Sequence, residues 1–543
     1  MSLIVPLDVI RRTSSPKLER HRNGPAFGRQ LEVEVEADID SDALSEIAAV
    51  ARELNRSRVF RAADAILQAR QGMFDKPVPN FDAFMATLVA FLSANPIDHW
   101  VYIEGADGLL YPYLVQSVSY ETGKTYNRQK NDPYVEMELA AYGHDRNDSD
   151  RRQAGKSVGY GTRSVRFRPQ QVVRRRVADA LALGGIYKET PSLKENYLAS
   201  MNRYREKIAG AFSEKLTVTG RSVDERRGGE DSNGHRKAIH DLHPAELSAL
   251  PSPEETRLTP RSPAVLCAVP EHPVVRVFDL KTHDYYWVHS DHLEPHEYDA
   301  SLAGKIVLPE SHRDLLDILT TDVSAFTADI VEGKSAGNVI LCKGQPGVGK
   351  TLTAEVYAEL IKRPLYSIHT GTLGTTASKI KEELELAFKR AKRWNAVLLL
   401  DEADVFVLQR GNDVEQNAIV AEFLRTLEYF DGLMFMTTNR PDDIDEAIIS
   451  RCAAIIGYDV PTPGLMAKVW RVMSDQFEAG LSVGLIDELA KAFPAASPRD
   501  IKMLLRLVLR VAKGHKEPLS LDLFRRCAMF RAVEYVAPEA NAA

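Results

Sequence analysis

Residues 338–360 read NVILCKGQPGVGKTLTAEVYAEL and decide the fold of the second half of the chain. The apolar run at 339–342 predicts a buried strand, and the residues after the loop predict an amphipathic helix. Between them, GQPGVGKT (344–351) fits the pattern G-x-x-x-x-G-K-[ST]. That pattern binds phosphate when a strand precedes it and a helix follows it, as here. The sequence therefore predicts a phosphate-binding loop in an α/β domain.

The residue types of this loop suit the binding of a nucleoside triphosphate. Glycines let backbone N–H groups curl around phosphate oxygens without a Cβ in the way. The N-terminus of the following helix adds about half a positive charge. We expect Lys350 to reach the β- and γ-phosphates and the Thr351 hydroxyl to bind Mg²⁺. The residues expected to line the nucleotide are Gly344, Gln345, Pro346, Gly347, Val348, Gly349, Lys350, Thr351 and Leu352.

A second segment, NAVLLLDEADVF (395–406), follows fifty residues later. Its apolar run at 396–400 is typical of a central parallel strand buried on both faces. The run ends in Asp401 and Glu402, and carboxylates at the C-terminal end of such a strand lie where α/β proteins bind ligands. We expect Asp401 to hold Mg²⁺ through water and Glu402 to act as the general base that polarises an attacking water.

A third segment, LMFMTTNRPDDID (433–445), predicts another strand with a polar end. Asn439 at that end has two interpretations. It would orient the attacking water or sense the γ-phosphate, or it is simply a turn residue, because Asn-Arg-Pro begins a turn in any case.

Together these segments resemble the AAA+ ATPase superfamily. GQPGVGKT resembles its Walker A motif, LLLDEAD its Walker B motif, and TTNRPDDIDEAIISRC its sensor 1 and second region of homology. The resemblance covers roughly residues 301–535. RPLYSIHTGTLGTTASKI, FLRTLEYFDGLMFMTTNR and VFDLKTHDYYWVHSDHLEPHEYD are similar to AAA proteins known from fungi that carry an uncharacterised N-terminal region. The implied fold class is α/β, a parallel-sheet P-loop domain with a helical lid, joined to an N-terminal α+β domain.

The resemblance implies ATP and Mg²⁺ as cofactors and gives three residues a role. Asn439 matches sensor 1. Arg451 matches the arginine finger, which enters a neighbouring subunit's site and stabilises transition-state charge on the γ-phosphate; the alternative is a surface arginine that caps a helix C-terminus. Arg499, in the sequence SPRD, resembles sensor 2, which would couple the position of the lid to the phosphates.

Two features depart from the family. Unfoldases of the family carry an aromatic–hydrophobic–glycine pore loop, whereas the matching region here reads GTLGTT (371–376), with Leu373 in place of the aromatic residue. Threading of a peptide through a pore therefore stays open. The HExxH motif of AAA membrane proteases is absent, since His296 and Glu297 lack a second histidine, which argues against a built-in zinc protease.

Changes in composition along the chain predict its domains. Helical spacing dominates up to about residue 97, strands follow Asp98, and helical spacing returns at 170–212. From about residue 308 strands and helices alternate, as in a parallel α/β sheet. The expected domains are 1–216, an α+β partner-recognition domain; 217–262, a flexible Pro- and Ser-rich linker; 263–300, a small β subdomain; 301–460, the large ATPase domain; and 461–543, the helical lid.

Charge excludes one class of protein and leaves a local question open. The 543 residues carry 69 basic and 76 acidic side chains, a net charge of −7, which excludes a globally basic protein that coats nucleic acid. Residues 151–176 nevertheless hold nine basic and no acidic residues, with Tyr160 and Phe167 among them. This segment would contact phosphates and stack on bases, or it is a solvated strand pair, or it pairs with acidic residues of a neighbouring subunit.

Four histidines cluster within 14 residues: His283, His289, His292 and His296. They would ligate a metal, or they belong to an exposed hairpin. The four cysteines form no CxxC pair, so we expect a reduced, cytoplasmic protein. No apolar run approaches the ~18 residues of a membrane helix, and the N-terminus lacks the features of a signal peptide.

We therefore expect a homo-oligomeric ring, a hexamer, because Arg451 is useful only to a neighbouring subunit. ATP hydrolysis would remodel a protein or complex recognised by residues 1–216. Two alternatives stay open. One is a nucleic-acid-directed ATPase that uses residues 151–176 in replication, mobile-element control or phage defence. The other is a switch that assembles with ATP but performs little work.

Overall fold

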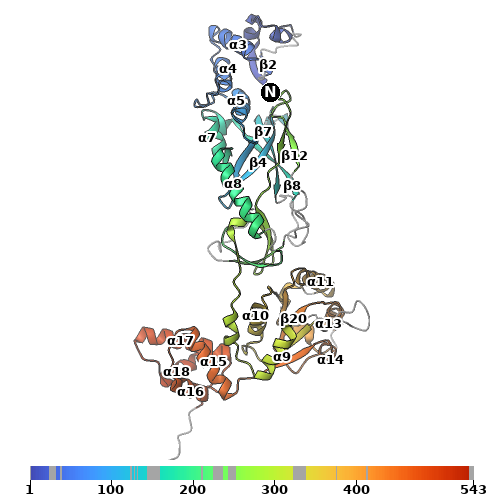
Figure 1. Ribbon diagram of the computed structural model, residues 1–543, viewed down its shortest axis with the longest axis vertical. Coiled ribbons are helices and arrows are strands. Elements are labelled where there is room, and N and C mark those ends of the chain that lie inside the picture. Colours follow the sequence, from blue (N-terminus) through green and yellow to red (C-terminus); the bar gives the residue numbers. More distant parts are fainter. Residues whose placement is uncertain are drawn as a thin grey trace, which may run out of the picture. The chain divides into compact units, whose positions relative to one another are not determined.

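A computed structural model describes residues 2–23, 32–36, 39–122, 125–126, 129–130, 132–143, 159–208, 212–223, 236–241, 252–321, 338–374, 376–410 and 414–536. The chain divides into two compact units. Unit 1 is Met1–Phe212 with Leu216–Glu294, and unit 2 is Ser213–Lys215 with Pro295–Ala543. In Figure 1, unit 1 runs from blue to green and unit 2 holds the orange and red helices.

The first hundred or so residues of unit 1 are mainly helical, as the apolar spacing predicts. They are α1 (Leu7–Arg12), α2 (Glu19–Arg22), α3 (Ser41–Glu53), α4 (Ser57–Arg70) and α5 (Phe81–Ser93). Asp40 and Asn80 cap α3 and α5, because each side chain accepts a hydrogen bond from the backbone N–H three residues on. Sequence reasoning missed the antiparallel pair β1 (Ser2–Pro6) and β2 (Glu32–Glu36), which falls inside the region expected to be helical.

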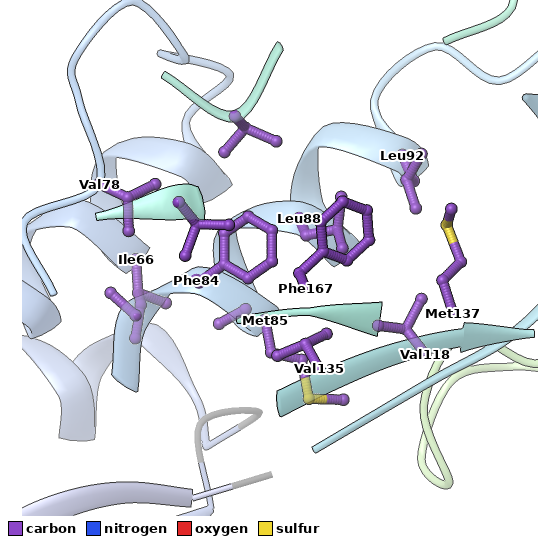
Figure 2. Close-up of a cluster of buried hydrophobic side chains, with 14 of the residues drawn as sticks. Ile66, Val78, Phe84, Met85, Leu88, Leu92, Val118, Val135, Met137 and Phe167 are labelled. Carbon is purple, nitrogen blue, oxygen red and sulfur yellow. The ribbon is translucent and has the colours of Figure 1, made fainter. Parts of the chain in front are cut away.

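An antiparallel sheet follows, with strand order β8-β7-β4-β3-β9. Its strands are β3 (Trp100–Glu104), β4 (Leu110–Glu121), β7 (Tyr134–Gly143), β8 (Gly159–Phe167) and β9 (Ile186–Lys188). Figure 2 shows how α5 meets the sheet: Phe84, Met85 and Leu88 point toward Val135 and Phe167. The rings of Phe84 and Phe167 meet edge to face at 5.4 Å, so the predicted strands after Asp98 do form and the helices cover them.

Short elements complete the first sheet region. These are β5 (Thr125–Tyr126), β6 (Gln129–Lys130), α6 (Pro169–Val172), α7 (Val177–Ala182) and α8 (Pro191–Arg203). The helical spacing expected over 170–212 is thus interrupted by β9 but otherwise present.

A second five-stranded sheet has the order β15-β14-β11-β10-β16. Its strands are β10 (Lys215–Val218), β11 (Arg236–His240), β14 (Val274–Asp279), β15 (Tyr285–His289) and β16 (Leu293–Pro295); β12 (Pro253–Thr256) pairs with β13 (Val265–Ala268). The expectation of a linker over 217–262 is therefore wrong for β11 and β12. Ala238, Ile239 and His240 are fully buried in β11, and a strand this short does not register in a composition dominated by polar neighbours.

Unit 2 contains a parallel sheet with strand order β18-β19-β20-β17-β21. The strands are β17 (Asn338–Gly344), β18 (Leu365–His369), β19 (Val397–Asp401), β20 (Leu433–Thr438) and β21 (Ala454–Tyr458). The helices are α9 (Glu310–Thr321), α10 (Lys350–Leu360), α11 (Ala377–Arg393), α12 (Asp404–Val407), α13 (Val414–Leu427) and α14 (Glu446–Ile449). Since β20 lies between β17 and β19, the ends of all three predicted motif strands meet at one sheet edge.

A helical subdomain follows in unit 2, as expected of a lid. It consists of α15 (Pro463–Gln476), α16 (Val483–Ala492), α17 (Pro498–His515) and α18 (Leu521–Ala528). The side chains of Trp470, Phe493 and Phe524 are fully buried at its centre. Within the described residues, no helix combines the length and the apolar character that crossing a membrane requires.

Candidate nucleotide-binding site

Lys350 connects the glycine loop to the end of β20. Its Nζ donates hydrogen bonds of 2.7 Å to the carbonyl oxygens of Gly344 and Gln345, and one of 3.0 Å to Asn439 Oδ1. The residue is only 6% exposed. Two residues that the sequence marked separately, 89 positions apart, are therefore in direct contact.

The charge of Lys350 is poorly solvated. Burial lowers the pKa of its ammonium group, and the positive charge of Arg499 lowers it further, while Asp404 and Asp401 act in the opposite direction. A buried cation of this kind gains from a nearby anion, because the anion replaces the solvation that burial removed. The electrostatics of the loop therefore favour an anionic ligand.

The Asp401 carboxylate accepts hydrogen bonds from hydroxyl groups of two other segments. Its Oδ1 accepts a hydrogen bond of 2.8 Å from Thr351 Oγ1 and one of 2.6 Å from Thr437 Oγ1. Carboxylate and hydroxyl oxygens are the hard ligands that Mg²⁺ prefers. The pair predicted as metal ligands, Thr351 and Asp401, thus lies together and fits that ion.

Glu402 has an unusual backbone. Its φ is +55°, in the left-handed region that non-glycine residues rarely adopt, and its N–H donates a 2.9 Å hydrogen bond to Thr437 Oγ1. Strain of this kind concentrates at functional sites, where surrounding contacts hold it. Glu402 is exposed and directly follows Asp401, the last residue of β19.

Sequence reasoning missed Thr437 and Asp404. Thr437 bonds both Asp401 and the backbone of Glu402, so it fixes the turn that carries the two predicted carboxylates. Asp404 Oδ1 accepts a 2.9 Å hydrogen bond from the N–H of Asn439. Both residues stand within the quoted segments 433–445 and 395–406, but only the strand order shows that they meet.

Two glycines of the loop have no room for a side chain. A Cβ on Gly344 would lie 2.2 Å from the carbonyl oxygen of Tyr458, and one on Gly347 would lie 2.8 Å from Arg499 Cβ. Gly347 also has a φ of +86°. Glycine is therefore required at both positions by the packing of the loop against Tyr458 and Arg499.

The lid contacts the glycine loop through the start of α17. Arg499 N–H donates a 3.2 Å hydrogen bond to the carbonyl oxygen of Gly347. Ser497 and Asp500 form a reciprocal capping box at this helix end, which fixes the position of Arg499 between them. The residue that resembles sensor 2 thus lies beside the phosphate-binding loop.

Arg451 lies elsewhere, directly after α14. Its guanidinium pairs with Glu428, and Nη1 donates a 3.1 Å hydrogen bond to the carbonyl oxygen of Ala447. In this structure Arg451 therefore caps the C-terminal end of α14, which is the alternative that the sequence left open.

Leu373 is 2% exposed, so it is a core residue. Gly374 next to it has a φ of +94° and turns the chain toward α11. The side chain at the position of the family's aromatic pore residue is therefore directed into the protein.

The four histidines do not form a metal site. Among the described residues no three or more His, Cys, Asp or Glu side chains are placed to hold a metal ion. His283 stacks on Phe278, and His296 donates to Glu359 at 3.0 Å. The rings of His289 and His292 lie 6.1 Å apart, whereas His283 and His296 have other partners, so the four do not converge on one point.

His289 belongs to a Ser–His–Asp grouping that lacks the chemistry of a catalytic triad. Its Nδ1 accepts a 3.1 Å hydrogen bond from the N–H of Asp291, so the proton sits on Nε2, which faces Ser200 Oγ at 3.4 Å. A protonated Nε2 cannot accept the serine proton. Burial lowers the pKa of His289 to about 4, and Ser200 donates to Asp291 instead.

The basic segment 151–176 is only partly described, because residues 151–158 lie outside the described ranges. Arg166 on β8 pairs with Glu136 on β7 at 2.9 Å, and Arg163 lies over the ring of Tyr113. Phe167, expected to stack on bases, is buried against Phe84. The described part matches the strand-pair alternative.

Comparisons with known proteins agree with this geometry. Residues 340–460 match the family described as "ATPase family associated with various cellular activities (AAA)". The chain is 26% identical over 232 residues to human ATPase family gene 2 protein homolog B, covering 40% of this chain and 30% of that protein. It is 30% identical over 195 residues to a putative 26S proteasome regulatory subunit homolog of Methanothermobacter marburgensis, covering 33% and 50%. The chain thus spans half or less of the length of these relatives.

A search of solved structures gave a match to a chain of the "Structure of E. coli MS115-1 HORMA:CdnC:Trip13 complex", with a TM-score of 0.37 and 19% identity, over 45% of this chain and 95% of that one. The match to the family rests on residues 340–460, which contain the glycine loop, Asp401, Glu402, Asn439 and Arg451. The chain therefore carries an ATPase domain of the AAA family.

Proposed function

We propose that this protein is a ring-forming AAA+ ATPase that hydrolyses ATP to ADP and phosphate in order to remodel a protein or protein complex. The observation that supports this best is the contact network at one sheet edge. Lys350 reaches Asn439, and Thr351 and Thr437 share Asp401. This network supports the proposal, because phosphoryl transfer needs a phosphate-binding cation, metal ligands and a water-orienting group close together.

Nucleotide binding belongs to the loop 344–351 and to Lys350. In this structure the Lys350 ammonium group donates hydrogen bonds to two loop carbonyls and to Asn439. The charged oxygens of a triphosphate are stronger acceptors and would replace them. Arg499 adds a second positive charge from the lid. Binding of ATP would thus change the contacts of Asn439 and of Arg499 on α17 directly.

Thr351 and Asp401 would hold Mg²⁺. When bound, that ion neutralises charge on the β- and γ-phosphates. Glu402 would then take a proton from the attacking water, because its side chain stands exposed beside Asp401 at the end of β19. Asn439 would orient that water, since Asp404 holds its backbone N–H and a bound triphosphate would free its side chain from Lys350.

Arg451 would complete the site of an adjacent subunit, which is the reason for proposing a ring, and specifically a hexamer. Its own contacts are with Glu428 and Ala447, away from the Lys350 network. An arginine supplied in trans is worth roughly 10³- to 10⁵-fold in turnover for nucleotide hydrolases. Hydrolysis would therefore depend on assembly.

Remodelling is the proposed output, with unit 1 as the part that recognises a protein client in the cytoplasm. The similarity to a putative 26S proteasome regulatory subunit homolog supports a protein client. Because Leu373 is buried, we do not include gripping of a threaded peptide by a loop at that position.

The test is ATP turnover of the purified chain as a function of protein concentration, with Mg²⁺ and with EDTA. We expect turnover per subunit to rise with concentration and to vanish in EDTA. Lys350→Ala should abolish nucleotide binding, whereas Lys343→Ala, a neighbouring lysine bonded to the Pro441 carbonyl, should retain it. Unchanged ATP affinity in Lys350→Ala would refute the assignment of the loop.

A further inference from the structure

The Arg451 guanidinium makes hydrogen bonds within its own subunit. Nη2 pairs with Glu428 Oε1, and Nη1 donates to the Ala447 carbonyl oxygen at 3.1 Å. Nε is buried and has no hydrogen-bond partner. Glu428 and the Ala447 carbonyl oxygen therefore hold the guanidinium in an orientation directed at its own subunit.

We propose that Glu428 is a latch that retains Arg451 in the unassembled subunit and releases it when a neighbouring nucleotide site offers a better anion. This inference rests on the proposed function, because it adds a regulatory step to the same arginine. Glu428 pairs with the Arg451 guanidinium, and we assign it the role of a positioning residue that acts through this arginine.

Different helices hold the backbones of Arg451 and Glu428. Arg451 follows α14, and Asp445 fixes that helix by accepting a 2.9 Å hydrogen bond from Ala447 N–H and by pairing with Arg410 at 2.8 Å. Glu428 follows the last residue of the longer helix α13. With both backbones held, release needs only rotation of the Arg451 side chain, not movement of an element.

The strength of the pair suits a latch. The side chains of Arg451 and Glu428 are 30% and 31% exposed, so water competes with the ion pair and its contribution is modest. A γ-phosphate carries more charge and accepts two parallel hydrogen bonds from one guanidinium, which makes it the stronger partner. The ion pair between Arg451 and Glu428 within one subunit would therefore raise the protein concentration needed for assembly without preventing assembly.

The rival interpretation is that Glu428 holds Arg451 in its working orientation in the assembled ring. The two interpretations predict opposite signs. Loss of a latch lowers the protein concentration needed for turnover, whereas loss of an orienting group lowers turnover at saturating concentration.

The first test is ATP turnover against protein concentration for Glu428→Gln, which keeps the side-chain shape and removes the charge. We expect half-maximal turnover at a roughly two- to fivefold lower concentration, the range of a partly exposed ion pair. Glu446→Gln removes an exposed charge from α14 and should match wild type. An unchanged midpoint, or lower saturated turnover, would overturn the latch.

A second test assigns the effect to one subunit. Lys350→Ala subunits supply Arg451 but bind no nucleotide, and Arg451→Ala subunits do the reverse, so a mixture hydrolyses ATP only where the two kinds meet. Glu428→Gln should raise turnover when combined with Lys350→Ala and should have no effect when combined with Arg451→Ala. Equal effects in both subunits would show that Glu428 acts on its own nucleotide site, against the proposal.

Failure of the latch and failure of the proposed function look different. If wild-type turnover per subunit is independent of concentration and Arg451→Ala is fully active, the trans role of Arg451 is wrong and the latch falls with it. If wild type depends on concentration but Glu428→Gln does not shift the midpoint, only the latch is refuted.

Discussion

The carboxylate of Asp404 accepts a 2.9 Å hydrogen bond from the backbone N–H of Asn439. The same Oδ1 accepts the Thr438 hydroxyl at 2.6 Å. Asp404 begins α12 after the β19 turn, and Asn439 follows β20. The contact therefore ties together the ends of the two strands that supply the proposed base and the proposed water-orienting amide.

Asp404→Ala should lower kcat for ATP hydrolysis about tenfold, with a smaller change in KM, because two hydrogen bonds to a charged group position Asn439. Steady-state kinetics measure both constants. Asp404→Asn keeps an oxygen acceptor at the same place and should retain most of the activity. If the Asn variant is as impaired as the Ala variant, the charge of Asp404 matters more than its hydrogen bonds.

Gly347→Ala should raise the dissociation constant for ATP at least about tenfold. Alanine at a φ of +86° is strained, and its Cβ would come within 2.8 Å of Arg499 Cβ, forcing the loop and α17 apart. Equilibrium binding of a fluorescent ATP analogue measures the effect. Gly371→Ala is the matched control, since its Cβ would meet nothing within 4 Å. Normal affinity in Gly347→Ala would mean that the loop opens freely.

Glu402→Gln should bind ATP with nearly wild-type affinity and hydrolyse it about 10²- to 10⁴-fold more slowly, because the amide cannot take a proton from water. With hydrolysis blocked, the variant should also accumulate as the assembled form in the presence of ATP. Single-turnover kinetics and sedimentation velocity measure the two effects. Turnover within a few-fold of wild type would assign the base role elsewhere.

Much of this site was predictable because its motifs are local. The glycine loop, the apolar run before Asp401 and the strand before Asn439 are each contiguous in the sequence. Local physics is sufficient for these: backbone access to phosphate, and carboxylates at the end of a buried strand.

The remaining contacts depend on strand order, which no local pattern specifies. Asp404 and Thr437 became visible as site residues only because β20 lies beside β19. The partners Glu428 and Arg451 are separated by 23 residues, and no spacing rule links them. In unit 1, β11 was hidden for a different reason: its three buried residues stand within a polar segment, so average composition suggested a linker.

A buried charged cluster in unit 2 provides a prediction about stability. Glu359 on α10 pairs with Lys215 at 2.5 Å and accepts a 3.0 Å hydrogen bond from His296. The three side chains are 7–12% exposed. These contacts join the last turn of α10 to two other segments of unit 2, residues 213–215 and the residues that follow 295.

Glu359→Gln should lower the free energy of unfolding at pH 7 by about 3 kcal/mol, because removing one charge of a buried pair leaves the other uncompensated.

Burial alone would raise the pKa of Glu359, but the hydrogen bonds from Lys215 and His296 outweigh it and hold the pKa below 4.5. A carboxyl whose pKa is lower in the folded state stabilises the protein above its unfolded pKa and loses this contribution as the pH falls through the folded pKa. The deficit of Glu359→Gln relative to wild type should therefore be constant near neutral pH and shrink below about pH 4.5. Urea denaturation at a series of pH values measures it, with Glu385→Gln, an exposed position on α11, expected to stay within about 0.5 kcal/mol of wild type. A deficit that persists unchanged at pH 3 would show that Glu359 acts through packing and not through its charge.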